Sequence, residues 1–252
     1  MSKRLVTLSG PSSVGKGAIT GKLRQLAPKL GLSYGRPVLY TSRAPRLGEV
    51  EGREFHFRSR EEIAALPDDR YVHADVRVLL QALDMQEVRA LLAQYNLVLA
   101  EVYHTFCPGL VQWTREHFPE CEVVRVFIVP FSAEELASRA GETGQANEEI
   151  ILEEMKRRLT ARRAAGLSDE SDEELLIRAQ AGVAEMQWAA ESDVVIVNRH
   201  GEDSPLWHRE DPAAWPEGEA RDVLERLIDC LTPGPSPCGR GGNGNDPSTP
   251  GG

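Results

Sequence analysis

The stretch that decides the fold is Gly10-Pro-Ser-Ser-Val-Gly-Lys16, which follows an apolar run at residues 5–8. Glycines at its first and sixth positions and a lysine at its seventh allow consecutive backbone N–H groups to wrap around a phosphate chain, with the Lys16 ammonium at the outer oxygens. A helix that begins near Lys16 directs its positive end at the same anion. The stretch therefore predicts a phosphate-binding loop between a strand and a helix. The residues expected at the phosphates are Gly10, Ser12, Ser13, Val14, Gly15, Lys16, Gly17 and Ala18.

The two residues after Lys16 depart from the usual phosphate loop. The pattern calls for Ser or Thr there, because its hydroxyl helps to hold Mg²⁺ beside the phosphates. Gly17 and Ala18 have no hydroxyl, and Thr20 lies most of a helical turn further on. A glycine-rich hairpin with an exposed lysine is the alternative interpretation. The helical apolar pattern at residues 18–26 favours the phosphate loop.

Length and composition predict one domain followed by a tail. The 252 residues are 41% hydrophobic, which is enough for the core of a single large domain, expected at residues 1–231. Residues 232–252 hold five prolines and seven glycines and almost nothing apolar, so we expect this tail to be disordered. The net charge of −10 disfavours binding to nucleic acid or to an anionic membrane. A small anion is therefore the expected partner.

The cysteine spacing and the N-terminal segment indicate in which cellular compartment the protein is expected. Cys107, Cys121, Cys230 and Cys238 have no C-x-x-C spacing, so neither a metal knuckle nor a redox pair is expected and no metal ligand is assigned. The chain runs straight into its first apolar run without the apolar core of a signal peptide, and no run approaches membrane-spanning length. We therefore expect a soluble cytoplasmic protein.

Short apolar runs alternate with helical patterns along the chain. The runs at residues 5–8, 97–99, 123–129 and 194–197 suit strands buried on both faces of a parallel sheet. The patterns at residues 18–30, 85–94, 133–138 and 179–190 suit helices between those strands, which predicts a three-layer α/β fold. Residues 34–57 predict a small β excursion. The acidic run at residues 168–174 predicts the capped start of a helix.

Beyond the phosphate loop, further blocks carry recognisable motifs. Thr41-Ser-Arg-Ala-Pro-Arg-Leu-Gly-Glu-Val-Glu-Gly-Arg-Glu-Phe-His-Phe57 is similar to T-T-R-x-P-R-x-G-E-x-x-G-x-x-Y-x-F, and two more blocks lie at residues 127–136 and 178–198. With the opening block at residues 5–13, they make the chain resemble the guanylate kinase family. The resemblance implies a three-layer P-loop kinase fold with a parallel core sheet. It also implies a small β acceptor-binding excursion at about 34–96 and a helical lid at about 139–178.

The same resemblance implies ATP and Mg²⁺ as cofactors, and roles for individual residues. Lys16 would bridge the β- and γ-phosphates, and Arg43 and Arg46 would grip the acceptor phosphate, although ion pairing with Glu49 or Glu51 is their alternative role. In the lid, Arg178 would lie on the transferring phosphoryl group. The family spacing places another lid arginine at Arg163, with Arg162 adjacent, and a further family arginine falls on Leu167. Asn198, which closes the last block, is expected at the nucleotide.

The departures from the family cluster in the expected acceptor site, which consists of Arg43, Arg46, Glu49, Phe55, His73 and Glu101. Phe55 replaces a phosphate-binding tyrosine. His73 falls where the family has a glutamate that reads the guanine edge, and a neutral histidine offers only one acceptor and one donor. The family Y-Y-G motif is missing near residues 79–81, and its D-x-D becomes Leu-Ala-Glu-Val at residues 99–102.

Three hypotheses follow. The first is an ATP-dependent kinase acting on GMP or a related nucleotide. The second is a phosphotransferase with the same machinery and a different phosphorylated acceptor, which His73 and the absent Y-Y-G favour. The third is a non-catalytic nucleotide-binding or interaction module, which Gly17, Ala18 and Leu167 favour. Interaction domains of the family generally lack the loop lysine, so Lys16 favours an enzyme with small-molecule nucleotides as partners.

Overall fold

The computed structural model describes residues 3–46, 48–166, 168, 170–208 and 210–232. Its centre is a four-stranded parallel sheet, in the order β6-β1-β7-β8. The strands are β1 (Lys3–Ser9), β6 (Leu97–Glu101), β7 (Cys121–Val129) and β8 (Val194–Val197). All four predicted apolar runs are strands of this sheet, which confirms the predicted parallel core. The predicted disordered tail lies outside the described residues except for Thr232.

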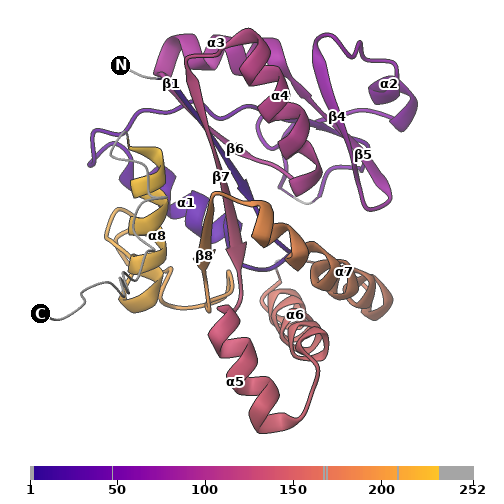
Figure 1. The fold of residues 1–252 in the computed structure, drawn as a ribbon, viewed down its shortest axis with the longest axis vertical. Coiled ribbons are helices and arrows are strands. Elements are labelled where there is room, and N and C mark those ends of the chain that lie inside the picture. The colour runs from indigo at the N-terminus through magenta and orange to yellow at the C-terminus, as the bar shows by residue number, and fades with distance from the viewer. Residues whose placement is uncertain (1–2, 47, 167, 169, 209, 233–252) are drawn as a thin grey trace, which may run out of the picture.

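Helices cover both faces of the core sheet and complete three layers (Figure 1). One face carries α1 (Lys16–Leu26) and α8 (Gly218–Leu231), and the other carries α3 (Met85–Tyr95) and α4 (Cys107–His117). Because β1 lies in the middle, its side chains alternate between the two layers: Val6 and Leu8 pack under α1, and Leu5 packs under α3. The predicted helix at residues 18–30 starts earlier, at Lys16, and ends at Leu26.

The excursion after α1 forms a second sheet, in the order β3-β2-β5-β4. Its strands are β2 (Leu39–Thr41), β3 (Phe55–Phe57), β4 (Tyr71–Val76) and β5 (Leu79–Asp84), and α2 (Arg60–Ala64) covers its outer face. The inner face is continuous with the core under α3 and α4, where Leu39, Ala74 and Val76 are buried together with Phe106. The second sheet is therefore fixed to the central sheet by shared apolar packing.

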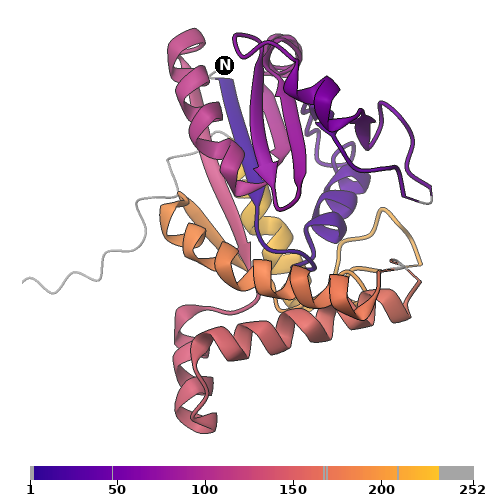
Figure 2. The same cartoon turned by 90° about the vertical axis from the view of Figure 1, so that its right-hand side faces the viewer.

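Between β7 and β8 the chain forms the helices of the expected lid. These are α5 (Ala133–Thr143), α6 (Asn147–Ala164), α7 (Asp172–Glu185) and the 3-10 helix η2 (Met186–Glu191); a second 3-10 helix, η1 (His104–Phe106), precedes α4. Figure 2 shows α6 and α7 side by side. Met155 and Leu159 of α6 are buried in the core cluster that also contains residues of α7 and α1. Ser171 caps α7 in a capping box with Glu174, which confirms the predicted helix start in the acidic run. None of the described helices has the length and apolarity needed to cross a bilayer.

Candidate active site

The loop between β1 and α1 has the backbone that a phosphate cradle requires. Gly10 has a φ of 144°, and a Cβ there would lie 2.5 Å from the carbonyl oxygen of Ile128. Gly15 has a φ of 87°, and a Cβ there would lie 2.4 Å from Nδ2 of Asn198. Both positions therefore exclude any side chain, for reasons of space as well as of φ. The loop passes tightly over the ends of β7 and β8.

Asn198, just beyond β8, holds this loop by its side-chain amide. Its Nδ2 donates to the carbonyl oxygens of Val14 at 2.7 Å and His200 at 2.8 Å, and its Oδ1 accepts from the His200 backbone N–H at 3.1 Å. Asn198 is completely buried. The structure therefore brings Asn198, a residue predicted for the nucleotide site, to the loop. Its side chain fixes the loop backbone through the Val14 carbonyl.

Lys16 folds back over the start of the loop. Its Nζ donates to the carbonyl oxygens of Gly10 at 2.5 Å and Pro11 at 2.8 Å. Burial lowers the pKa of the Lys16 ammonium, and the charges of Glu101, Glu185 and Glu202 oppose that shift. In phosphate loops of this pattern the lysine ammonium lies at the outer phosphate oxygens, so a phosphate chain bound here would have its outer end on the Gly10–Ser12 side of the loop.

Two arginines from different elements converge on that end of the loop. Arg178 on α7 donates from Nη2 to the Ser12 hydroxyl at 3.2 Å, and Arg77 between β4 and β5 donates to the same oxygen at 2.9 Å. The α7 helix itself contacts the loop, since a Cβ on Gly182 would lie 3.4 Å from Cβ of Pro11. The structure thus places Arg178 beside the loop, and it adds Arg77, which the sequence did not suggest.

Arg43 and Glu49 form a two-pronged ion pair in the segment after β2. Both Arg43 Nη atoms lie 2.6 Å from a Glu49 oxygen, and Glu49 also accepts from the Arg46 backbone N–H at 2.7 Å. The Arg43 guanidinium lies over the ring of Phe55 at 4.9 Å from the centroid. Phe55 therefore acts as an apolar platform for Arg43, and Glu49 fixes the turn that carries both arginines.

Arg46 and Arg178 meet at one carboxylate, that of Glu170. Arg46 Nη2 lies 3.4 Å from Glu170 Oε1, and Arg178 Nη1 donates to the same oxygen. Burial acts to raise the pKa of Glu170, but hydrogen bonds from Arg178 and Ser168 outweigh it, so the pKa is lowered. Arg46, in the segment after β2, and Arg178, on α7, are thereby linked through Glu170.

The two adjacent arginines at the end of α6 point to different partners. Arg163 Nη2 pairs with Asp172 at 2.7 Å, and its Nη1 donates to the Glu170 carbonyl at 3.1 Å. Arg162 pairs with Glu202 at 3.4 Å. A Cβ on Gly17 would lie 2.8 Å from the same carboxylate, so Arg162 is the one beside the phosphate loop. Arg163, which the family spacing selects, instead braces the start of α7, and Leu167 lies outside the described residues.

His73 is not brought to this site. It lies on the α2 side of β4, where its Nε2 is 3.0 Å from the Ile63 carbonyl oxygen and its Nδ1 is 3.1 Å from Asp68. Arg43 and Phe55 lie toward the opposite face of that sheet. Strand alternation is the physical reason, because each one-residue step along β4 reverses the face.

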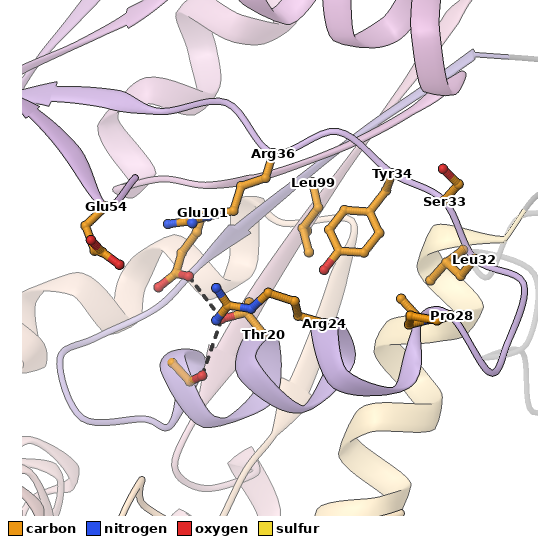
Figure 3. A pocket seen from close by; sticks show the side chains of 12 residues that line it. Thr20, Arg24, Pro28, Leu32, Ser33, Tyr34, Arg36, Glu54, Leu99 and Glu101 are labelled. Carbon is orange, nitrogen blue, oxygen red and sulfur yellow. Dashed lines mark hydrogen bonds between the residues drawn. The ribbon is translucent and has the colours of Figure 1, made fainter. Parts of the chain in front are cut away.

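Glu101, the last residue of β6, points toward α1. Its Oε2 accepts from the Thr20 hydroxyl at 3.3 Å, and its charge acts on Lys16. Glu101 and Thr20 line a cavity of about 470 Å³ between α1 and residues 32–36. Arg24, Tyr34 and Arg36 line the same cavity (Figure 3). Glu101 is thus placed beside α1 by its contact with Thr20, in a cavity that Glu54 also lines.

Comparison with known proteins gives a consistent result. Residues 2–164 match the family model described as guanylate kinase. The guanylate kinase of Synechococcus sp. (strain JA-3-3Ab) is 36% identical over 171 residues, which are 67% of this chain and 73% of that protein. The chain belongs to the guanylate kinase family. The guanylate kinase of Desulfitobacterium hafniense (strain Y51) is 30% identical over 196 residues, 77% of this chain and 81% of that protein.

A crystal structure of guanylate kinase from Anaplasma phagocytophilum has the same fold. The TM-score is 0.53 at 21% sequence identity, with 91% of this chain and 85% of that chain covered. The predicted P-loop kinase fold is therefore confirmed.

Sequence reasoning missed several residues of this guanylate kinase-family site. Arg77 and Tyr103 both donate to the carboxylate of Glu185, at 2.9 and 3.0 Å. Arg77 is part of no recognisable motif. Its contact with Ser12 depends on where the β4–β5 hairpin packs, and the two residues are 65 positions apart in the sequence. Glu170 was visible only as one acid in an acidic run.

Proposed function

We propose that this chain transfers the terminal phosphoryl group of ATP to GMP. The observation that carries the proposal is the convergence of Arg178 and Arg46 at the outer end of a glycine loop that is closed over by Lys16. These cations come from three elements far apart in the sequence. In this proposal, the donor phosphate and the acceptor phosphate lie in line between them. Membership of the guanylate kinase family supports GMP as the acceptor.

Phosphoryl transfer requires no covalent bond between the substrate and the protein. Phosphoryl transfer depends on holding two anions in line and neutralising charge on the transferring group. Backbone N–H groups of the loop and Lys16 hold the donor. Arg43, stacked on Phe55 and fixed by Glu49, together with Arg46 holds the acceptor phosphate. Arg178 reaches the group between them.

Enzymes of this family use Mg²⁺ with ATP, and the residues here fit an ion held mainly by phosphate oxygens and water. Gly17 and Ala18 offer no ligand, and the Thr20 hydroxyl donates to the Lys16 carbonyl at 3.0 Å. The described residues include no cluster of three or more His, Cys, Asp or Glu side chains that could hold a metal. Mg²⁺ commonly keeps several waters and binds through substrate phosphates. Glu101, beside Thr20, is placed to accept hydrogen bonds from such waters.

The test is an ADP-release assay with ATP, Mg²⁺ and a panel of nucleoside monophosphates. We expect turnover with GMP, and a loss of about 100-fold or more in kcat for Lys16→Ala, because hydrogen bonds from a charged group to phosphate contribute roughly 1.5–3 kcal/mol each. The matched control is Lys29→Ala in the turn that follows α1, where Lys29 pairs with Asp211 at the surface.

Both variants should unfold at the temperature of the unmodified chain, since Lys16 has no apolar packing role in the core clusters. Turnover with another monophosphate but none with GMP would contradict the proposal, as would full activity in Lys16→Ala.

A further inference from the structure

Arg77 occupies a backbone position that rarely holds an arginine. It begins the two-residue turn between β4 and β5, where Val76 pairs with Leu79, and its φ is 59°. Among the described residues, only Ser13 and Asn96 share a positive φ without being glycine, one in the phosphate loop and one at the end of α3. Left-handed backbone at a bulky residue persists where the surroundings impose it, often at functional sites.

The surroundings of Arg77 fix its guanidinium at the phosphate loop. Nη2 donates to Ser12 Oγ at 2.9 Å and to Glu185 Oε1 at 2.9 Å. The Glu185 side chain is 2% exposed and also accepts from the Tyr103 hydroxyl at 3.0 Å. Arg77 itself remains 24% exposed. A buried carboxylate therefore anchors one side of the guanidinium and leaves its other donors available at the mouth of the loop.

Two guanidinium groups share the Ser12 hydroxyl, because Arg178 also donates to it, at 3.2 Å. Two cations on one neutral oxygen repel each other, and the charge of Arg77 contributes to the lowered pKa of both Arg178 and Lys16. Such an arrangement is favourable when an anion lies between the cations. Lys16 assigns this end of the loop to the outermost phosphate.

We propose that Arg77 binds the transferring phosphoryl group of ATP together with Arg178. The inference rests on the proposed function for the identity of the donor. No bond to Arg77 forms or breaks; its planar fork neutralises charge on the phosphoryl oxygens as they pass from ADP to the acceptor.

The test compares Arg77→Gly, which suits the positive φ, with Arg77→Lys, which keeps the charge and loses the fork. The probes are the imido analogue of ATP and ADP, each with Mg²⁺, titrated by calorimetry. Arg77→Gly should bind the analogue at least 10-fold more weakly while its affinity for ADP changes less than 3-fold. The turnover of Arg77→Gly should fall at least 100-fold, with partial rescue by added guanidinium ion. The turnover of Arg77→Lys should lie between those of Arg77→Gly and the unmodified chain.

The control is Arg60→Ala, because Arg60 supports the same hairpin through Asp75 and the Val78 carbonyl without reaching the loop. It should bind both nucleotides as the unmodified chain does. Equal affinities of Arg77→Gly and the unmodified chain for the analogue would overturn the inference, and so would equal weakening for analogue and ADP. If Arg77→Gly melts early, Arg77→Asn, which also tolerates a positive φ, replaces it.

The binding measurement needs no acceptor, so it separates this inference from the proposed function. Selective loss of the analogue in a chain that does not phosphorylate GMP would support the role of Arg77 and contradict GMP as the acceptor. If Arg77→Gly phosphorylates GMP as fast as the unmodified chain, the result would support GMP as the acceptor and contradict the role of Arg77.

Discussion

Three arginines of the site are each held by a carboxylate from the chain itself. Glu49 holds Arg43, Glu185 holds Arg77, and Glu170 holds Arg178. A guanidinium that is partly removed from water needs a partner, and a carboxylate with matching geometry keeps its planar fork in a fixed orientation. The hydrogen bonds from Arg43 lower the pKa of Glu49, so this carboxylate is ionised at neutral pH. The chain itself therefore fixes the orientation of these three guanidinium groups.

Replacing Glu49 by Gln should weaken acceptor binding. The amide keeps the shape of the side chain but loses its charge, so Arg43 loses its two-pronged anchor and Arg46 loses part of its turn. We expect the KM for GMP to rise about 10-fold, equivalent to about 1.4 kcal/mol, with kcat changed less. Steady-state kinetics checks this, with Glu51→Gln on the same segment as the control. A KM within 2-fold of the original value would show that Arg43 is held by Phe55 alone.

The sequence predicted the residues whose placement depends on local spacing. Gly10, Gly15 and Lys16 are set by one turn between a strand and a helix, so their motif was sufficient. His73 was misplaced in the expected pocket because the face it occupies depends on the strand register, which a motif does not contain. Arg77 was missed because its contact joins two segments that only the packed second sheet brings together.

Elements around η1 carry a titratable group that the proposed reaction does not use. The imidazole of His104 stacks on Trp188 at 4.5 Å between ring centroids, and is 7% exposed. Burial, with a contribution from the charge of Arg77, lowers the pKa of His104 to about 4. The helix and the segment before it are therefore packed around a neutral ring.

Acid should loosen this part of the molecule. In the unfolded chain His104 binds a proton below about pH 6.5, whereas in the folded chain it binds one only below about pH 4. The free energy of unfolding therefore decreases as the pH falls through that interval. Between pH 7 and pH 4.5 the single group accounts for about 2 kcal/mol. Urea unfolding at both pH values checks this. His104→Gln should show a pH difference that is smaller by that amount, and an unchanged difference would mean that the ring protonates freely in the folded state.

At the level of elements, the buried strands were easier to predict than the helices around them. The four core strands are nearly continuous apolar runs, and such runs have few alternatives in a chain of this composition. The early end of α1 at Leu26 was not apparent, because residues 27–30 continue its apolar pattern in turns. The α8 helix was not predicted, although its buried face, including Val223, Leu224 and Leu227, completes the layer beside α1.

Across the whole molecule, the second sheet and the pair of helices α6 and α7 rest on opposite layers of the core. The second sheet shares its apolar packing with α3 and α4, whereas α6 and α7 share theirs with α1 and α8. Glu170 joins these two halves across the mouth of the phosphate loop, since its carboxylate contacts Arg46 from one and Arg178 from the other. The ion pair of Arg77 with Glu185 on α7 makes a second link between the same two parts.

Glu170→Gln should therefore favour the acceptor. Without the negative charge, Arg46 and Arg178 are no longer neutralised by the chain itself, so the KM for GMP should fall about 3- to 10-fold. The melting temperature should fall as well, because the two guanidinium groups then repel each other across the mouth. Kinetics and thermal unfolding measure both effects, and Glu173→Gln on the exposed first turn of α7 is the control. A rise in KM would mean that Glu170 orients Arg46 more than it competes with the phosphate.

The carboxylate of Glu170 also serves as a tethered counter-ion for Arg46 and Arg178. Chloride and other small monoanions gain little by entering, because they would displace a carboxylate of equal charge that is already in place and tethered. A phosphate monoester carries up to two negative charges at neutral pH and offers three oxygens, so it outcompetes the carboxylate. If Arg46 and Arg178 bind phosphates as proposed, we therefore expect selectivity for phosphates over the abundant monoanions of the surrounding solution, before any base is recognised.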